Sequence, residues 1–158
     1  MASDPVVLMN NPESLSIDSQ GRMRAAGVII SNEHLLRYFY DKLVWNVDLS
    51  SWIIRTENKA VEVNIEDTAY VVKSIEGNDG QLELILNDFS REIFKPETLM
   101  NDTEGNSAFY CKVKKGQYTA KLLSAAAQTL FPEIEESDGT FLFRGHTVEK
   151  IDRENSIS

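Results

Sequence analysis

The sequence predicts an α+β protein made of two small related subdomains, with an antiparallel sheet and two main helices. Short segments alternate apolar and polar residues, which is the period of a half-buried strand, and turn residues separate them. Two other stretches repeat apolar residues every three to four positions, which is the period of an amphipathic helix. One turn pattern also occurs twice, because Ser19-Gln20-Gly21 is followed by Gly27 and Ser137-Asp138-Gly139 by Gly145 at the same spacing. Each copy is typical of a tight turn, a short strand and a second turn, so we expect two related halves.

The first predicted subdomain spans residues 14–86 and follows a flexible arm at 1–13. A small hairpin is predicted around the Ser-Gln-Gly turn. Ser31 is the predicted N-cap of a helix over 32–44, because a serine oxygen accepts a hydrogen bond from the first turn and Glu33 suits the helix dipole. Strands are predicted at 52–56, 61–65, 70–75 and 82–86. Their links are short, so we expect antiparallel pairing, since a parallel pair needs a long crossover.

A polar connection over 87–105 leads to the second predicted subdomain, residues 106–151, and a flexible tail over 152–158. Phe109, Cys111 and Val113 share one face of a predicted strand. A second amphipathic helix is predicted over 117–131, and Pro132 ends it because proline cannot continue a helix. A hairpin around Gly139 closes the fold.

The composition argues against several classes of partner and cofactor. The chain of 158 residues has a formal net charge of −9, which repels nucleic acids and anionic membranes, so we expect neither as a partner. It has no apolar run of membrane-spanning length and no signal-like N-terminus, so we expect a cytoplasmic protein. One cysteine and two histidines exclude an internal disulfide and leave little for a metal site. We therefore expect no metal and no cofactor.

One locally basic stretch is the predicted binding site. Lys112 and Lys114 fall on one strand face, and Lys115 and Gly116 lead into the predicted helix at 117, near Lys121. A helix N-terminus presents unpaired N–H groups, so lysines beside it would complete a site for phosphate or carboxylate. The alternative is a charged strand face that only keeps the protein soluble.

Three other groups of residues are candidates for a functional or a structural role. Trp45 and Trp52 flank a link between helix and sheet, where they would either contact a protein partner or lock the core. Glu66 and Asp67 end a strand, where they would open a turn or, if the strand breaks, act as an acid–base pair or cation ligands. Cys111 alternates with core residues and is expected to be buried and unreactive.

Several stretches in order resemble the DUF1285 family of bacterial proteins of unknown function. They are Gly27-Val28-Ile29-Ile30 before Leu35-Leu36-Arg37-Tyr38-Phe39, Arg55-Thr56 before Ile65-Glu66-Asp67-Thr68-Ala69, and Tyr110 to Gly116 before Ala120-Lys121. The resemblance implies two α+β subdomains, loosely like pleckstrin-homology modules, and a role in bacterial signalling. It supplies no catalytic residue.

The sequence therefore favours a non-catalytic binding module that recognises a partner protein or a small anionic ligand. No pattern of a known nucleophile, P-loop or zinc protease occurs in it. Two alternatives remain at this point. One is a hydrolase-like enzyme that uses Glu66 and Asp67, and the other is a homo-oligomeric scaffold joined through a sheet edge or an apolar patch.

Overall fold

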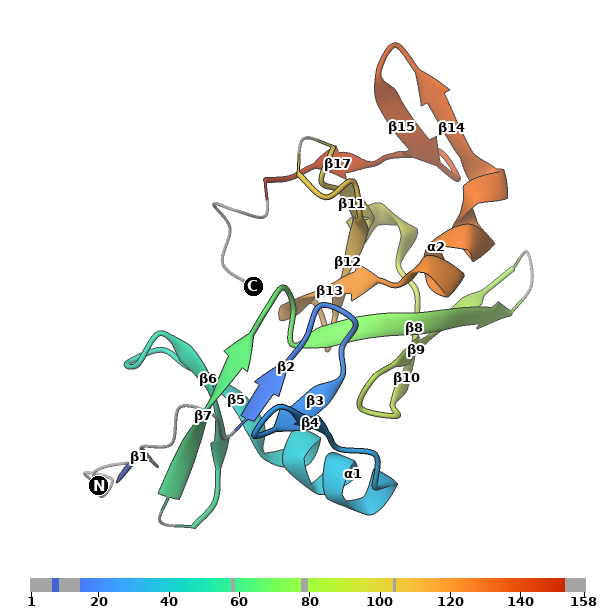
Figure 1. Ribbon diagram of the computed structural model, residues 1–158. Helices are drawn as coiled ribbons and strands as arrows, with labels where there is room; N and C mark the ends of the chain where they lie inside the picture. The colour runs from blue at the N-terminus through green and yellow to red at the C-terminus, as the bar shows by residue number, and fades with distance from the viewer. Residues whose placement is uncertain (1–6, 9–14, 58, 78–79, 104, 153–158) are drawn as a thin grey trace. The chain divides into compact units, whose positions relative to one another are not determined.

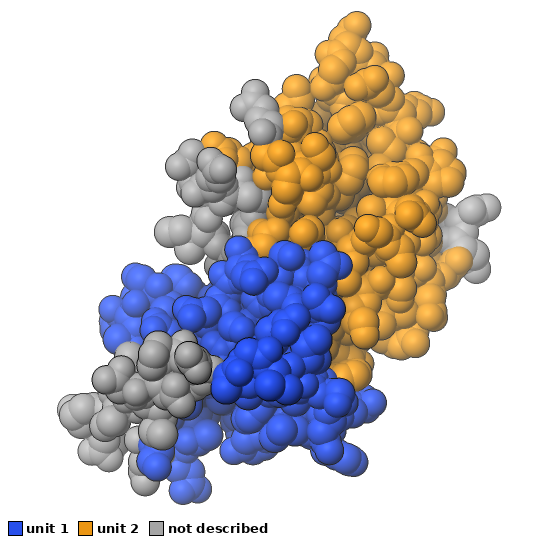
Figure 2. Space-filling model, in the orientation of Figure 1, with its two compact units in different colours: residues 1–66 blue, residues 67–158 orange. Residues whose placement is uncertain are grey.

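The computed structural model describes residues 7–8, 15–57, 59–77, 80–103 and 105–152. The chain divides into two compact units, unit 1 (residues 1–66) and unit 2 (residues 67–158), which Figure 2 colours separately. Each unit contains one large sheet and one main helix (Figure 1), so the predicted α+β class is confirmed. The division falls between Glu66 and Asp67, earlier than the predicted boundary after Leu86. The physical reason is that the strands between these points pair inside the sheet of unit 2.

Unit 1 is a mixed sheet with one helix. Two three-stranded antiparallel meanders flank the helix in sequence, and the first strand of the first meander pairs in parallel with the last strand of the second. The strand order is therefore β4-β3-β2-β7-β6-β5. The elements are β1 (Val7–Leu8), β2 (Leu15–Ile17), β3 (Met23–Ala25), β4 (Val28–Ile29), α1 (Glu33–Lys42), β5 (Leu43–Asn46), β6 (Ser51–Arg55) and β7 (Lys59–Ile65).

Local sequence accounts for most of these boundaries. Ala26 and Gly27 have φ angles of 51° and 82°, as a two-residue hairpin turn requires, and a glycine takes the second position without strain. The N-cap of α1 is Asn32, whose side chain accepts from the Leu35 N–H, and not the predicted Ser31. The helix ends at Lys42, before the predicted residue 44, because Leu43 and the residues after it pair with β6. Val7–Leu8 pairs with β7, which corrects the loose arm predicted there; the rest of 1–13 lies outside the described residues.

Unit 2 repeats this plan and adds a C-terminal segment. Its large sheet has the order β10-β9-β8-β13-β12-β11-β17, and β8 pairs in parallel with β13. A helix and a separate three-stranded sheet follow. The elements are β8 (Tyr70–Gly77), β9 (Leu82–Leu86), β10 (Arg91–Ile93), η1 (Pro96–Thr98), β11 (Met100–Asn101), β12 (Phe109–Val113), β13 (Tyr118–Leu122), α2 (Ser124–Leu130), η2 (Phe131–Glu133), β14 (Ile134–Ser137), β15 (Thr140–Phe143), β16 (His146–Thr147) and β17 (Glu149–Lys150).

The second predicted helix is wrong in its first half. Residues 118–122 form β13, and only 124–130 are helical. Thr119, Ala120 and Leu122 are buried, because β13 lies between β8 and β12 in the middle of the sheet. Tertiary pairing thus overrides a local pattern that suits either structure. The predicted connection over 87–105 also contains β10, η1 and β11.

The expectation of a purely antiparallel sheet is corrected as well. β2 pairs with β7 and β8 with β13 in parallel, and a whole meander of intervening chain supplies the long crossover that such a pair needs. In both large sheets, the three strands of the first meander lie next to the three strands of the second.

The repeated glycine pattern does not mark equivalent parts of the two units. Asp138-Gly139 forms the turn between β14 and β15 of the separate sheet, so the pattern marks local hairpins. No described helix has the length and apolar character needed to cross a membrane.

Candidate functional site

The predicted lysine site is a hairpin turn and not a helix N-terminus. Lys114, Lys115 and Gly116 have φ angles of 56°, 58° and 80°, and they connect β12 to β13. The Gln117 N–H donates to the Lys114 carbonyl oxygen and closes the turn. The expectation that helix N–H groups would complete an anion site here is therefore wrong, because the chain continues as a strand.

Three of the four lysines are also engaged by neighbouring side chains. The Lys114 Nζ lies 2.5 Å from Asp88 Oδ2 and 3.0 Å from Ser90 Oγ, and it stands 5.1 Å from the centre of the Tyr70 ring. The Lys112 Nζ donates to Thr119 Oγ1 at 2.9 Å. Lys121 Nζ lies 3.9 Å from Asp67 Oδ2. Lys115 is exposed.

Burial alone would raise the pKa of Asp88, but hydrogen bonds from Lys114 and Ser90 outweigh it and hold that pKa below its usual value. Asp88 is therefore an ionised carboxylate that neutralises Lys114. The structure fills this place with the protein's own acidic group.

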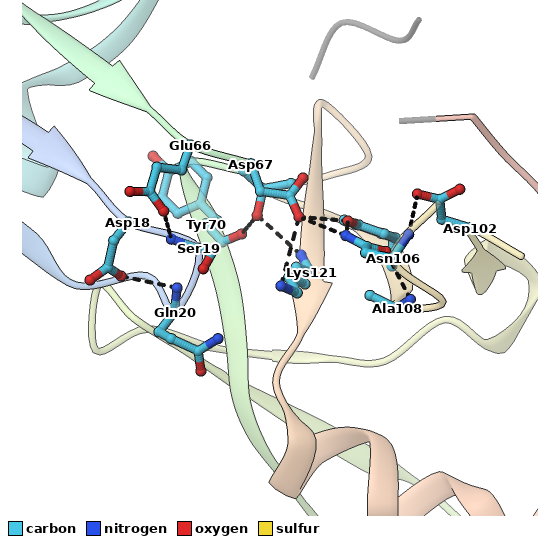
Figure 3. Close-up of polar contacts among 12 residues, drawn as sticks. Asp18, Ser19, Gln20, Glu66, Asp67, Tyr70, Asp102, Asn106, Ala108 and Lys121 are labelled. Carbon is cyan, nitrogen blue, oxygen red and sulfur yellow. Dashed lines mark hydrogen bonds and ion pairs between the residues drawn. The ribbon is translucent and has the colours of Figure 1, made fainter. Parts of the chain in front are cut away.

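Glu66 and Asp67 do not form a common site (Figure 3). The Glu66 carboxylate accepts from the Ser19 N–H at 2.8 Å. The Asp67 carboxylate instead accepts from the Tyr110 hydroxyl at 2.6 Å and lies near Lys121. The two carboxylates diverge, so they lack the convergence that a paired acid–base or cation site would need.

The remaining predicted residues are the two tryptophans and the cysteine. Trp45 and Trp52 face each other across β5 and β6, with ring centres 5.9 Å apart in an edge-to-face arrangement, and Trp52 is buried. Cys111 is fully buried, and burial raises the pKa of its thiol. No group of three metal-ligating His, Cys, Asp or Glu side chains occurs among the residues that the structure describes.

A cavity of about 520 Å³ in unit 1 brings together residues that the sequence did not single out. Tyr38 and Lys42 come from α1, one helical turn apart. The hairpin that joins β6 and β7 supplies the rest, held by the Thr56 N–H donating to the Lys59 carbonyl oxygen at 2.9 Å. The complete lining is Tyr38, Lys42, Arg55, Thr56, Glu57 and Lys59.

The lining is positively charged in an acidic protein. It holds three cationic side chains and one carboxylate, and the Lys42 ammonium stands 5.8 Å from the centre of the Tyr38 ring. Lys42 also lies 3.4 Å from the exposed Asp41 carboxylate. Arg55 and Lys59 form no ion pair with a described residue.

The other basic side chains of unit 1 form ion pairs, and Arg22 and Arg24 share the carboxylate of Asp18. Residues 1–66 contain six lysines and arginines, and the three that do not line the cavity each pair with a carboxylate. Arg22 and Arg24 lie 2.9 and 3.3 Å from Asp18 Oδ2, and Arg37 lies 2.8 Å from Glu33 Oε2. Among the residues that the structure describes, Arg55 and Lys59 are thus the basic side chains of unit 1 that form no ion pair, and both line this cavity, which can hold an anion by charge and by hydrogen bonds.

Sequence reasoning missed this site because its residues are far apart in sequence. The one local signal is Arg55 and Lys59, which lie at and just after the end of the strand predicted over 52–56. No local pattern indicates that Tyr38 and Lys42 lie beside that turn, since this depends on how α1 packs on the sheet.

No protein-family model and no curated protein matches the chain. Its structure is similar to the crystal structure of a DUF1285 family protein from Silicibacter pomeroyi DSS-3, with a TM-score of 0.70 and 17% identity, over 95% of this chain and 85% of that one. It is also similar to a DUF1285 family protein from Shewanella baltica OS155, with a TM-score of 0.56 and 15% identity, over 78% of this chain and 94% of that one. The resemblance indicated by the sequence is thus confirmed in the structure, and the chain has the fold of DUF1285 family proteins.

Proposed function

We propose that this protein is a non-catalytic binding module whose ligand is a small anion held in the unit 1 cavity. One observation carries the proposal: three basic side chains of unit 1 line one cavity beside an aromatic ring, and two of them, Arg55 and Lys59, pair with no carboxylate among the residues that the structure describes. Lys42, Arg55 and Lys59 would supply charge-assisted hydrogen bonds, and the Tyr38 hydroxyl and ring would contact the body of the ligand.

The first test is a titration of the full chain with inorganic phosphate, against sodium chloride at the same ionic strength, followed by amide chemical shifts. Phosphate should shift signals of α1 and of the β6–β7 hairpin. Arg55→Gln and Lys59→Gln should each weaken binding about tenfold or more, because each removes a hydrogen bond between charged groups.

Arg37→Gln is the matched control, since it removes a unit 1 cation that is already paired with Glu33. It should bind phosphate as the unaltered chain does. The proposal would be overturned if phosphate caused no chemical-shift change, or if the unaltered chain and the three variants all bound phosphate equally well.

A second candidate function is association with a partner protein or a second copy of this chain. Seven of the nine exposed large apolar side chains among the described residues belong to unit 1, and large exposed apolar areas mark interaction surfaces. They are Val28, Ile29, Leu35, Tyr38, Val44, Val47 and Leu49. Sedimentation at rising protein concentration tests self-association, and Val28→Lys with Val47→Lys should abolish any dimer that forms this way.

We also propose that the two units are variants of one module, loosely like a pleckstrin-homology module. Their shared strand order supports this, since two meanders joined by a central parallel pair recur in each. A signalling role, which the family resemblance implies, stays a prediction.

A further inference from the structure

The small three-stranded sheet of unit 2 has an uncovered edge. Its strand order is β14-β15-β16, so β14 is an edge strand, and no strand lies along its outer side in the part of the chain that the structure describes. Figure 1 shows the β14–β15 hairpin standing clear of the large sheet of this unit. An edge strand presents unpaired backbone N–H and C=O groups, which can pair with another extended chain. β14 is therefore a place where a strand from another molecule can add.

This edge is acidic, and most of its charge has no partner among the described residues. Residues 131–143 contain four carboxylates and no lysine or arginine. The first of the four, Glu133, is held by the Arg144 guanidinium through two hydrogen bonds of 2.8 and 3.0 Å. The other three are exposed and form no ion pair with a described residue; they are Glu135, Glu136 and Asp138. The edge therefore attracts a positively charged chain, and it repels the same edge of a second copy.

A cluster of three phenylalanine rings lies beside this hairpin. The ring of Phe109, at the start of β12, has its centre 6.1 Å from that of Phe131 in η2 and 5.9 Å from that of Phe141 in β15. Phe131 is 50% exposed, and the other two side chains are half-buried. Edge-to-face and tilted contacts hold the rings in place while part of each stays exposed. The cluster is therefore an ordered apolar surface, and aromatic residues are enriched at protein interfaces.

The strand register puts this cluster and the negative charge on the same face. Glu136 of β14 lies opposite Phe141 of β15, and Ile134 lies opposite Phe143. Residues directly opposite each other in an antiparallel pair point to the same side. Phe143 is fully buried, so this face belongs to the core there and reaches the surface at Phe141 and Glu136. A side chain that binds at this point would meet a carboxylate and an aromatic ring together.

Protection against aggregation does not account for this combination. Charged residues on an edge strand keep it from pairing with other edges, and the three carboxylates alone would serve that purpose. Partly exposed aromatic rings beside them have the opposite effect, because exposed apolar surface promotes association. An ammonium or guanidinium group is attracted both by a carboxylate and by the face of an aromatic ring. The edge therefore suits a chain that carries cationic side chains.

We propose that the β14 edge binds an extended, positively charged segment of a partner protein, which adds to the small sheet as a fourth strand. The segment carries lysine or arginine opposite Glu136 and Glu135, and an aliphatic residue opposite Ile134 on the face of the phenylalanine rings. Antiparallel pairing is the more stable arrangement. Along Ser137 to Ile134 it corresponds to the partner sequence Thr-Lys-Lys-Val. The proposal uses no residue of the unit 1 cavity and so goes beyond the proposed function.

The test is a titration of the full chain with an acetylated and amidated peptide of two Thr-Lys-Lys-Val repeats, followed by amide chemical shifts. Signals of β14, β15 and η2 should shift, and nuclear Overhauser contacts should join the peptide backbone to the backbone of β14. The control peptide has glutamate in place of every lysine. It should leave these signals unchanged, because like charges oppose its approach.

Two variants and two matched controls locate the binding site. Glu136→Gln and Phe131→Ala should each weaken binding of the lysine peptide about tenfold, since they remove a carboxylate and an aromatic contact. Glu62→Gln removes an exposed carboxylate of unit 1, and Ile93→Ala shortens a side chain of unit 2 that is 46% exposed. Both controls should bind the peptide as the unaltered chain does. The variants at 136 and 131 change exposed side chains, so their thermal midpoints should stay close to that of the unaltered chain.

The outcomes decide the proposal in both directions. Binding of the lysine peptide with backbone contacts to β14, weakened by the two variants and by neither control, supports it. The proposal is overturned if the lysine peptide does not bind, or if the glutamate peptide binds equally well. It is also overturned if the peptide binds without contacting β14, or if Glu136→Gln and Phe131→Ala bind it as tightly as the controls do.

Discussion

The Tyr110 hydroxyl provides a sharp test of how unit 2 is stabilised. Tyr110 is fully buried, and its hydroxyl donates to Asp67 Oδ2 at 2.6 Å and accepts from Asn106 Nδ2 at 2.9 Å. Tyr110→Phe removes this hydroxyl and leaves the ring in place. Asp67 then loses a partner while its side chain stays 13% exposed, with Lys121 Nζ at 3.9 Å and Asn106 Nδ2 at 3.5 Å from its carboxylate.

The expected loss in the free energy of unfolding follows from the hydrogen bond between Tyr110 and the Asp67 carboxylate. A hydrogen bond to a charged group contributes about 1.5–3 kcal/mol, roughly twice a neutral one. Asn106 is exposed and can bind water in place of the hydroxyl, so the loss falls mainly on Asp67. We therefore expect Tyr110→Phe to lower the free energy of unfolding by about 1.5–3 kcal/mol.

The assay is urea unfolding followed by far-ultraviolet circular dichroism at neutral pH. Tyr38→Phe is the matched control, because it removes the same atom from a side chain that is 48% exposed, and it should stay within about 0.5 kcal/mol of the unaltered protein. In a double-mutant cycle, Asp67→Asn and Tyr110→Phe should be clearly non-additive. A loss for Tyr110→Phe no larger than that of the control would refute the reasoning.

Three further predictions concern acid stability, a turn and the thiol. Folding lowers the pKa of Asp88, so the contribution of this carboxylate to the free energy of unfolding is present above the ordinary pKa of 3.8 and is lost as the pH falls through the lower pKa of the folded state. The Asp88→Asn variant should therefore be less stable than the unaltered chain at neutral pH, and its free energy of unfolding should fall less on acidification, as measured by urea unfolding at several pH values. Gly77→Ala should destabilise the protein more than Gly139→Ala, since both have positive φ but only at Gly77 would the added Cβ meet a backbone oxygen, that of Gln81, at 2.3 Å; equal thermal midpoints would contradict this. Burial and the raised pKa of Cys111 should make its thiol unreactive to an aromatic disulfide until urea unfolds the chain, and rapid labelling in buffer would show that it is accessible.

The binding site predicted from the sequence and the one proposed from the structure differ for a physical reason. The sequence shows several basic residues within 112–121, but it could not indicate that Asp88 and Glu92 reach the same turn. A lysine such as Lys114, which has no acidic neighbour in the sequence, is neutralised in the folded chain by a carboxylate from another part of the sheet. The unit 1 cavity is the opposite case, because its cations come from a helix and a hairpin that meet only through packing.

Features that depend on a few neighbouring residues could be predicted from the sequence. Alternating apolar residues in β7 and β9, glycine turns at Gly27 and Gly139, and the inward-facing Cys111 all follow from local geometry and appear as expected. The parallel pairs of β2 with β7 and β8 with β13, the extended form of 118–122 and the pairing of Lys114 with Asp88 became visible in the folded chain alone. These depend on contacts between distant segments, whose partners no local window of sequence contains.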